Sequence, residues 1–226
     1  MTAIITLQYN QLNHSESEMT PQKFLKHFEL LRRQYPIVTP GDYLPKADTA
    51  ICLTFEDAST AFYEHIFPLL TKYQIKAILG VSTASLQHQT SPNNQCTLSM
   101  LRTMAKSGWV KLATKGHTNS RLTNKKTDLI AELIDSKQFL MDHTGCDVDY
   151  FIYPEGRYTR RIHAFVKYYY AWGFGQGNAF NIGFPEQTRL LHRVNATPFW
   201  HSNQAFLATD LAKWQRNYWL YRLLGW

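Results

Sequence analysis

The sequence has few of the features that mark exported, membrane-spanning or disulfide-stabilised proteins. Its three cysteines, Cys52, Cys96 and Cys146, lie far apart and form neither a disulfide framework nor a zinc-binding spacing. No apolar run approaches the roughly 18 residues that span a bilayer, and the N-terminus lacks a basic segment followed by an apolar one. These absences predict a soluble, cytoplasmic protein in a reducing compartment.

Positive charge is in excess, but it is not concentrated in one place. The net charge is +7 and the isoelectric point is about 9.3, which would favour anionic partners. The pairs Arg32-Arg33 and Lys125-Lys126 are typical of solvated helix faces. No motif of a nucleic-acid-binding module is present, so the sequence predicts no nucleic-acid partner.

The length and composition are those of one ordinary globular domain. The chain has 226 residues, of which 44% are hydrophobic and 18% are charged. It contains no internal repeat, no low-complexity segment and no linker-like stretch. We therefore expect a single domain over residues 1–226.

Strand-like and helix-like segments alternate along the chain. Apolar runs rich in β-branched residues predict strands at 3–7, 50–55, 77–81, 110–112 and 150–153. Apolar residues three or four positions apart predict helices at 20–32, 62–70, 98–107 and 126–142. This alternation predicts an α/β fold, a mainly parallel sheet or barrel covered by helices.

Ligands of such folds bind beyond the carboxyl ends of the strands. Four polar segments occupy such positions: Glu56-Asp57, Lys115 to Asn119, Tyr153 to Arg157, and the residues that follow Leu190-Leu191. We expect the functional site among them.

Four motifs in the same order resemble the polysaccharide deacetylase family, the NodB-homology domain. ICLTFEDASTAFYEHIFPLLTKYQIKA resembles its Thr-Phe-Asp-Asp-Gly motif, and KLATKGHTNSRLT resembles its Ser-His-x-x-x-His-x-x-Leu motif. DYFIYPEGRYT resembles its Tyr-Pro-x-Gly loop, and ITLQYNQL resembles its Tyr-His opening, which would place Tyr9 in the substrate groove. The resemblance implies a deformed (β/α) barrel of the glycoside hydrolase–deacetylase type.

The resemblance also implies a chemistry, which this chain matches poorly. Family members hold zinc or another divalent metal with one Asp and two His, and a second Asp is the general base. The metal-binding Asp corresponds to Asp57, and the base corresponds to Glu56, which is one methylene longer. The two histidines correspond to Lys115 and Asn119, neither of which is a suitable metal ligand. Asp57 is then the only retained ligand.

His117 does not restore the missing pair of metal-binding histidines. The residues four positions away are Ala113 and Arg121, so no register provides two ligands. We therefore expect neither a metal nor another cofactor. The ammonium of Lys115 would instead take over the charge role of the metal, which predicts an ion pair between Asp57 and Lys115.

The later segments offer further candidates for a groove. Tyr153 and Pro154 could form its wall, or the turn could only seal the barrel, and Arg157 is expected to reach the carboxylates. His192 is a weak candidate for the acid that protonates the leaving amine, although a lone histidine is more often structural.

Three interpretations of function remain open. The first is a catalytically degenerate family member that binds a carbohydrate or a partner protein. The second is an active hydrolase of N-acetylated glycans with a rearranged or metal-free site built from Glu56, Asp57, Lys115 and His117. The third is a surface module whose basic, aromatic ending WQRNYWLYRLLGW docks on a membrane or a partner. The simpler view of that ending is a last helix that packs against the barrel.

Overall fold

The structure is a computed structural model that describes residues 2–10, 20–87, 94–199, 206 and 208–223. Within these residues one eight-stranded sheet closes on itself, because β1 pairs with both β2 and β8. All of its strands except β7 are parallel to their neighbours, which gives the (β/α) barrel that the sequence predicts. The strands are β1 (Ala3–Tyr9), β2 (Thr49–Phe55), β3 (Ala77–Val81), β4 (Val110–Thr114), β5 (Tyr150–Ile152), β6 (Trp172–Gln176), β7 (Asn181–Ile182) and β8 (Leu190–Asn195).

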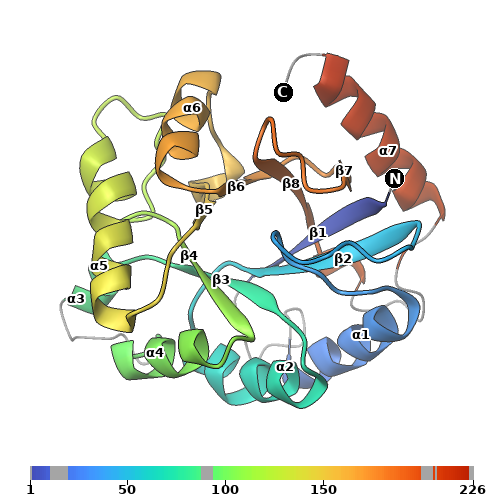
Figure 1. Cartoon of the computed structure of the whole chain (residues 1–226), viewed down its shortest axis with the longest axis horizontal. Coiled ribbons are helices and arrows are strands. Elements are labelled where there is room, and N and C mark those ends of the chain that lie inside the picture. Colours follow the sequence, from blue (N-terminus) through green and yellow to red (C-terminus); the bar gives the residue numbers. More distant parts are fainter. Residues whose placement is uncertain (1, 11–19, 88–93, 200–205, 207, 224–226) are drawn as a thin grey trace.

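Helices surround the barrel, as Figure 1 shows. They are α1 (Pro21–Gln34), α2 (Phe67–Tyr73), α3 (Ala84–Gln87), α4 (Leu98–Lys106), α5 (Ser136–Thr144), α6 (Arg160–Tyr169) and α7 (Ala208–Leu223). Thr20 caps α1 by accepting a hydrogen bond from the Lys23 amide at 3.2 Å, and Pro21 occupies the first turn. Asp128 accepts bonds from the amides of Ile130 and Ala131, so the helical segment before α5 begins later than the predicted residue 126.

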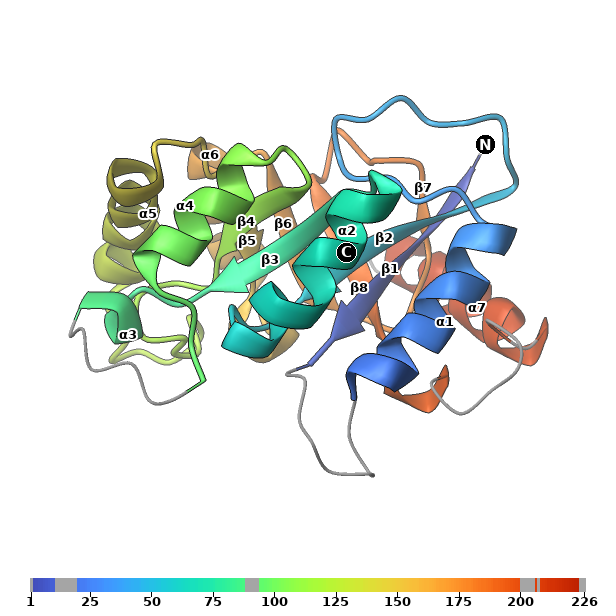
Figure 2. The ribbon, with the colours of Figure 1, turned by 90° about the horizontal axis from the view of Figure 1, so that it is seen from below.

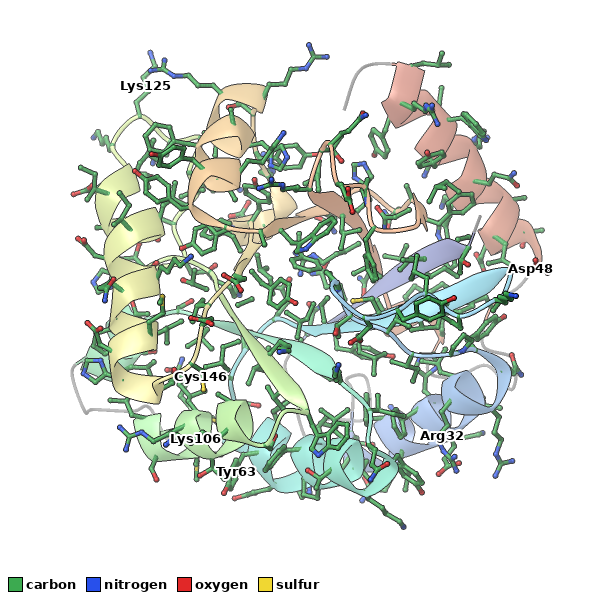
Figure 3. All side chains as sticks on the ribbon, viewed as in Figure 1. Arg32, Asp48, Tyr63, Lys106, Lys125 and Cys146 are labelled. Carbon is green, nitrogen blue, oxygen red and sulfur yellow. The ribbon has the colours of Figure 1, made fainter. Side chains whose placement is uncertain are left out.

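Alternation along the strands sorts side chains to two sides of the barrel wall. A compact group fills the interior: Ile4, Cys52, Ile78, Ala113, Tyr150, Ile152, Phe174 and Leu191. The larger core lies outside the wall, under the helices. Figure 3 shows side chains crowding the space enclosed by the strands. Because the interior is packed, a site on the barrel axis must lie at its rim, where the parallel strands end (Figure 2).

The last helix packs on the barrel, which confirms the simpler view of the C-terminal segment. Trp214 is buried against Phe199 and Phe206, with ring centroids 5.5 and 5.2 Å away. Apolar side chains of α7 also face solvent, among them Trp219 and Leu223. No helix in the described part of the chain is long and apolar enough to cross a bilayer.

Candidate functional site

A cluster of buried charges lies at the barrel rim. Glu56 follows β2 directly, Lys115 follows β4, and Arg193 belongs to β8. The Lys115 ammonium lies 2.9 Å from Glu56 Oε2, and Arg193 Nη1 donates a hydrogen bond to Glu56 Oε1. Arg193 is 1% exposed and Lys115 is 4% exposed. Each oxygen of the Glu56 carboxylate therefore has its own cation.

Asp57 completes this cluster from the solvent side. Lys115 Nζ lies 3.2 Å from Asp57 Oδ1, which confirms the predicted ion pair. The Asp57 side chain is 48% exposed, whereas that of Glu56 is 12% exposed. Glu56, Asp57, Lys115 and Arg193 are named the rim cluster below, and their formal charges cancel.

The rim cluster keeps Glu56 ionised. Burial alone would raise the pKa of this carboxyl, but the charges of Arg193 and Lys115 outweigh it and lower the pKa below its usual value. A general base works best when its pKa lies near the working pH. Glu56 is therefore a firmly held counter-ion and a weak proton acceptor.

Gly80 of β3 makes the room that Lys115 needs. A Cβ atom at position 80 would lie 2.9 Å from Lys115 Cδ, 2.8 Å from the Glu56 carbonyl oxygen and 3.1 Å from Ile152 Cδ1. The aliphatic stem of the lysine thus crosses the space left open by the missing side chain, which brings the ammonium to the acidic pair.

We expect the Gly80→Ala variant to lose about 1–3 kcal/mol of unfolding free energy, because overpacking forces Lys115 and the strand end after β2 apart. Urea denaturation measures this loss. In a double variant with Lys115→Ala the two losses should be less than additive, because the Cδ contact is already gone. Strict additivity would mean that Gly80 does not accommodate the lysine.

The rim cluster does not fit the metal that the resemblance implies. The Lys115 ammonium lies between the two carboxylates that a divalent cation would need, and a protonated amine has no lone pair to offer. Asn119, at the position of the second ligand, is exposed and has a left-handed backbone with φ of 60°. Among the described residues no group of three His, Cys, Asp or Glu side chains is placed to hold a metal ion.

His117 anchors its loop and does not join the rim cluster. Its Nδ1 lies 2.9 Å from Thr83 Oγ1, and its carbonyl oxygen accepts a 2.9 Å hydrogen bond from the Ala84 amide. The Glu132 carboxylate accepts hydrogen bonds from the Thr118 amide at 3.0 and 3.2 Å. The segment that carries the family's histidine motif is thus fixed by ordinary loop contacts.

The Tyr-Pro-x-Gly segment differs from the groove wall that we expected. Tyr153 is fully buried, and its hydroxyl bonds His163 Nδ1 at 2.6 Å; Pro154 is buried as well. Arg157 does not reach the carboxylates within the described structure, because its ion pair is with Glu155 at 3.8 Å. Tyr153 and Arg157 thus lie apart from the rim carboxylates, an arrangement closer to the simpler view, that the turn seals the barrel.

Tyr9 and His192 are also displaced from the predicted groove. Tyr9 is fully buried under α1, where its ring stacks on Phe55 at 4.9 Å. His192 stacks on Tyr221 of α7 at 4.6 Å, outside the barrel wall. Since neighbouring strand residues point to opposite faces, the position of Arg193 inside the rim excludes His192 from it.

Arg193 is the residue that sequence reasoning missed. Strand alternation was the available signal, because it allows only one of His192 and Arg193 to face the rim. The choice between them depends on which face of β8 is turned inward. The apolar pair Leu190-Leu191 before them fits either phase, since both residues are buried.

Comparisons with known proteins agree with this architecture. A family model described as polysaccharide deacetylase matches residues 44–171, more than half of the chain. YxkH of Bacillus subtilis (strain 168), whose name places it among polysaccharide deacetylases, is 26% identical over 208 residues, which cover 85% of this chain and 71% of that protein.

Two solved structures share the fold at low sequence identity. IcaB from Ammonifex degensii matches with a TM-score of 0.74 and 19% identity, over 95% of this chain and 97% of its own. The Streptococcus pyogenes deacetylase PplD, in complex with acetate, matches with a TM-score of 0.74 and 19% identity, over 94% and 98% of the two chains. The motifs, the barrel and the family model agree: this chain belongs to the polysaccharide deacetylase family.

Proposed function

We propose that this chain binds a carbohydrate and has lost the metal-dependent hydrolysis of its family. The observation that carries the proposal is the Lys115 ammonium, which lies 2.9 Å from Glu56 and 3.2 Å from Asp57. A fixed positive charge at this point satisfies both carboxylates and opposes the entry of a divalent cation. Carbohydrate is the ligand class on which the family acts, which favours it over a protein partner.

The groups that hydrolysis needs are also poorly placed. Glu56 is a weak base because Arg193 and Lys115 hold its pKa low. The candidate acid His192 packs on Tyr221, on the other face of β8. A hydrolase with a rearranged site would depend on Asp57, whose carboxylate is half exposed. The cavity beside Asp57 is only about 30 Å³, room for a water or two and far below the size of typical ligand pockets.

Metal content is the first test of this proposal. After dialysis against zinc, cobalt and manganese, we expect the wild type to hold well below one equivalent by elemental analysis. A Lys115→His/Asn119→His variant, which restores two imidazole ligands beside Asp57, should approach one equivalent. A stoichiometric metal in the wild type would overturn the proposal.

Acetate release and ligand binding complete the test. The wild type should release no acetate from N-acetylated oligosaccharides above the blank, with or without added metal, and should bind such oligosaccharides in calorimetric titrations. Acetate release by the wild type would favour the rearranged hydrolase, and the absence of any glycan binding would contradict carbohydrate recognition.

A further inference from the structure

A cavity of about 700 Å³ lies on the outer wall of the barrel, away from the rim cluster. It is bounded by β8, by residues 185–188 and by the last turns of α7. In Figure 1, α7 lies beside β1, β7 and β8. The chain between β6 and β8 contains the short strand β7 and, in the described structure, no helix, so α7 covers this part of the wall. The size is typical of small-molecule sites.

The loop side of the cavity is held in place from behind by α6. His163 Nε2 lies 2.7 Å from the carbonyl oxygen of Thr188, and Lys167 Nζ donates a 2.7 Å hydrogen bond to the carbonyl oxygen of Gln187. Both contacts use main-chain atoms. The side chains of this loop therefore remain available to the cavity.

The helix side is fixed to the barrel as well. Tyr221 donates a 3.0 Å hydrogen bond to the Gly177 carbonyl, and the ring of Tyr218 stacks on Phe180 at 5.4 Å. Asn217 Nδ2 donates a 2.8 Å bond to the Asn178 carbonyl. The two walls are thus set before a ligand arrives, which lowers the ordering cost of binding.

The floor of the cavity carries a buried histidine. His192 is 6% exposed, and its Nδ1 is buried without a hydrogen-bond partner among the described residues. The ring stacks on Tyr221. Burial, with a smaller effect of the nearby His163, lowers the pKa of His192 to about 4, so the imidazole is neutral near pH 7 and adds no charge to the cavity.

The polar groups around the cavity differ in kind. Arg222 is donor-only, Glu186 is acceptor-only, and the amide of Gln187 is both. In the described structure the side chains of Glu186 and Gln187 make no hydrogen bond, and Arg222 contacts only Tyr218 and the ring of Trp219. A site for a charged ligand would carry side chains of the opposite charge only, whereas this cavity has one cationic and one anionic side chain. This mixture of donors, acceptors and aromatic rings suits a neutral molecule rich in hydroxyl groups, with an apolar face for the tyrosines.

We propose that this wall cavity binds a carbohydrate, with Tyr218 and Tyr221 contacting the sugar ring and Glu186, Gln187 and Arg222 its hydroxyl groups. The proposal rests on the proposed function and gives it a location other than the rim. It also places the sugar in a cavity far larger than the one of about 30 Å³ beside Asp57.

Calorimetric titration with N,N′-diacetylchitobiose and with cellobiose tests the location. Gln187→Trp, on the exposed loop, should fill the cavity and raise Kd at least about tenfold for the sugar that binds. The matched control is Gln138→Trp on the exposed side of α5, which should bind like the wild type. Circular dichroism checks that both variants fold.

Arg222→Ala provides a second, independent readout, because it removes donors without adding bulk and should also weaken binding. Binding that survives Gln187→Trp and Arg222→Ala but is lost in Asp57→Trp would overturn the wall site and leave the proposed function standing. Absence of binding of both sugars to the wild type would overturn the wall site for these ligands and, with broader glycan panels, the proposed function itself.

Discussion

Replacing Arg193 with methionine is expected to lower the unfolding free energy by about 3–5 kcal/mol, because removal of one partner leaves a buried charge uncompensated. In the variant, Lys115 is the one rim-cluster cation left for the two carboxylates of Glu56 and Asp57. Two carboxylates then share one ammonium, and the Glu56 side chain, which loses its second cation, is only 12% exposed. Urea denaturation at pH 7 measures the loss. Both proteins are fitted with one common slope of unfolding free energy against urea concentration.

Two controls separate this effect from loss of side-chain packing. Arg157→Met removes an exposed arginine with a 3.8 Å contact to Glu155 and should change stability by about 0.5 kcal/mol or less. The double variant Arg193→Met/Glu56→Gln removes both charges of the pair and should recover part of the loss. Equal losses for Arg157→Met and Arg193→Met, or no recovery in the double variant, would contradict the account of the rim cluster.

The second large effect is an acid-sensitive core. Burial lowers the pKa of His27 from the usual 6.5 to about 4, and burial with the smaller effect of His163 lowers that of His192 from 6.5 to about 4. In the unfolded chain both rings bind a proton below pH 6.5, whereas in the folded protein they do so only near pH 4. The unfolding free energy therefore has its full value above pH 6.5. It falls as the pH drops toward 4, by about 3 kcal/mol for each histidine.

His27→Leu tests this prediction at one position. Both ring nitrogens of His27 are buried without a hydrogen-bond partner within the described residues. The His27→Leu variant should therefore be at least as stable as the wild type at pH 7. The slope of unfolding free energy against pH between 6.5 and 4 should become shallower. His65→Gln, at a less buried histidine, serves as the control, and equal slopes in all three proteins would contradict the prediction.

The sequence predicted the barrel and three of the four residues of the rim cluster for a clear reason. Glu56, Asp57 and Lys115 each stand directly after an apolar strand, so chain position alone brings them to one rim. The ion pair then follows from charge. Arg193 lies within its strand, and its orientation depends on the phase of β8, which two adjacent leucines do not reveal.

Strand β6 was missed for a different reason. Its sequence, WGFGQ, contains two glycines, which weaken any strand prediction. In the structure the ring of Tyr153 would lie 2.9 Å from a Cβ atom at Gly173, and that of Tyr158 would lie 2.6 Å from one at Gly175. The glycines are there because tyrosines from the preceding loop cover this strand. The same packing buries Tyr153 and removes it from the expected groove.

The lysine at the rim also changes how the fold depends on its surroundings. A metal ion exchanges with solvent, so a barrel rim built around one weakens when a chelator or a scarce supply removes the ion. The Lys115 ammonium is bonded to the chain and lies on two carboxylates at once. The cation on which these two carboxylates close is thus encoded in the polypeptide and cannot be removed by a chelator.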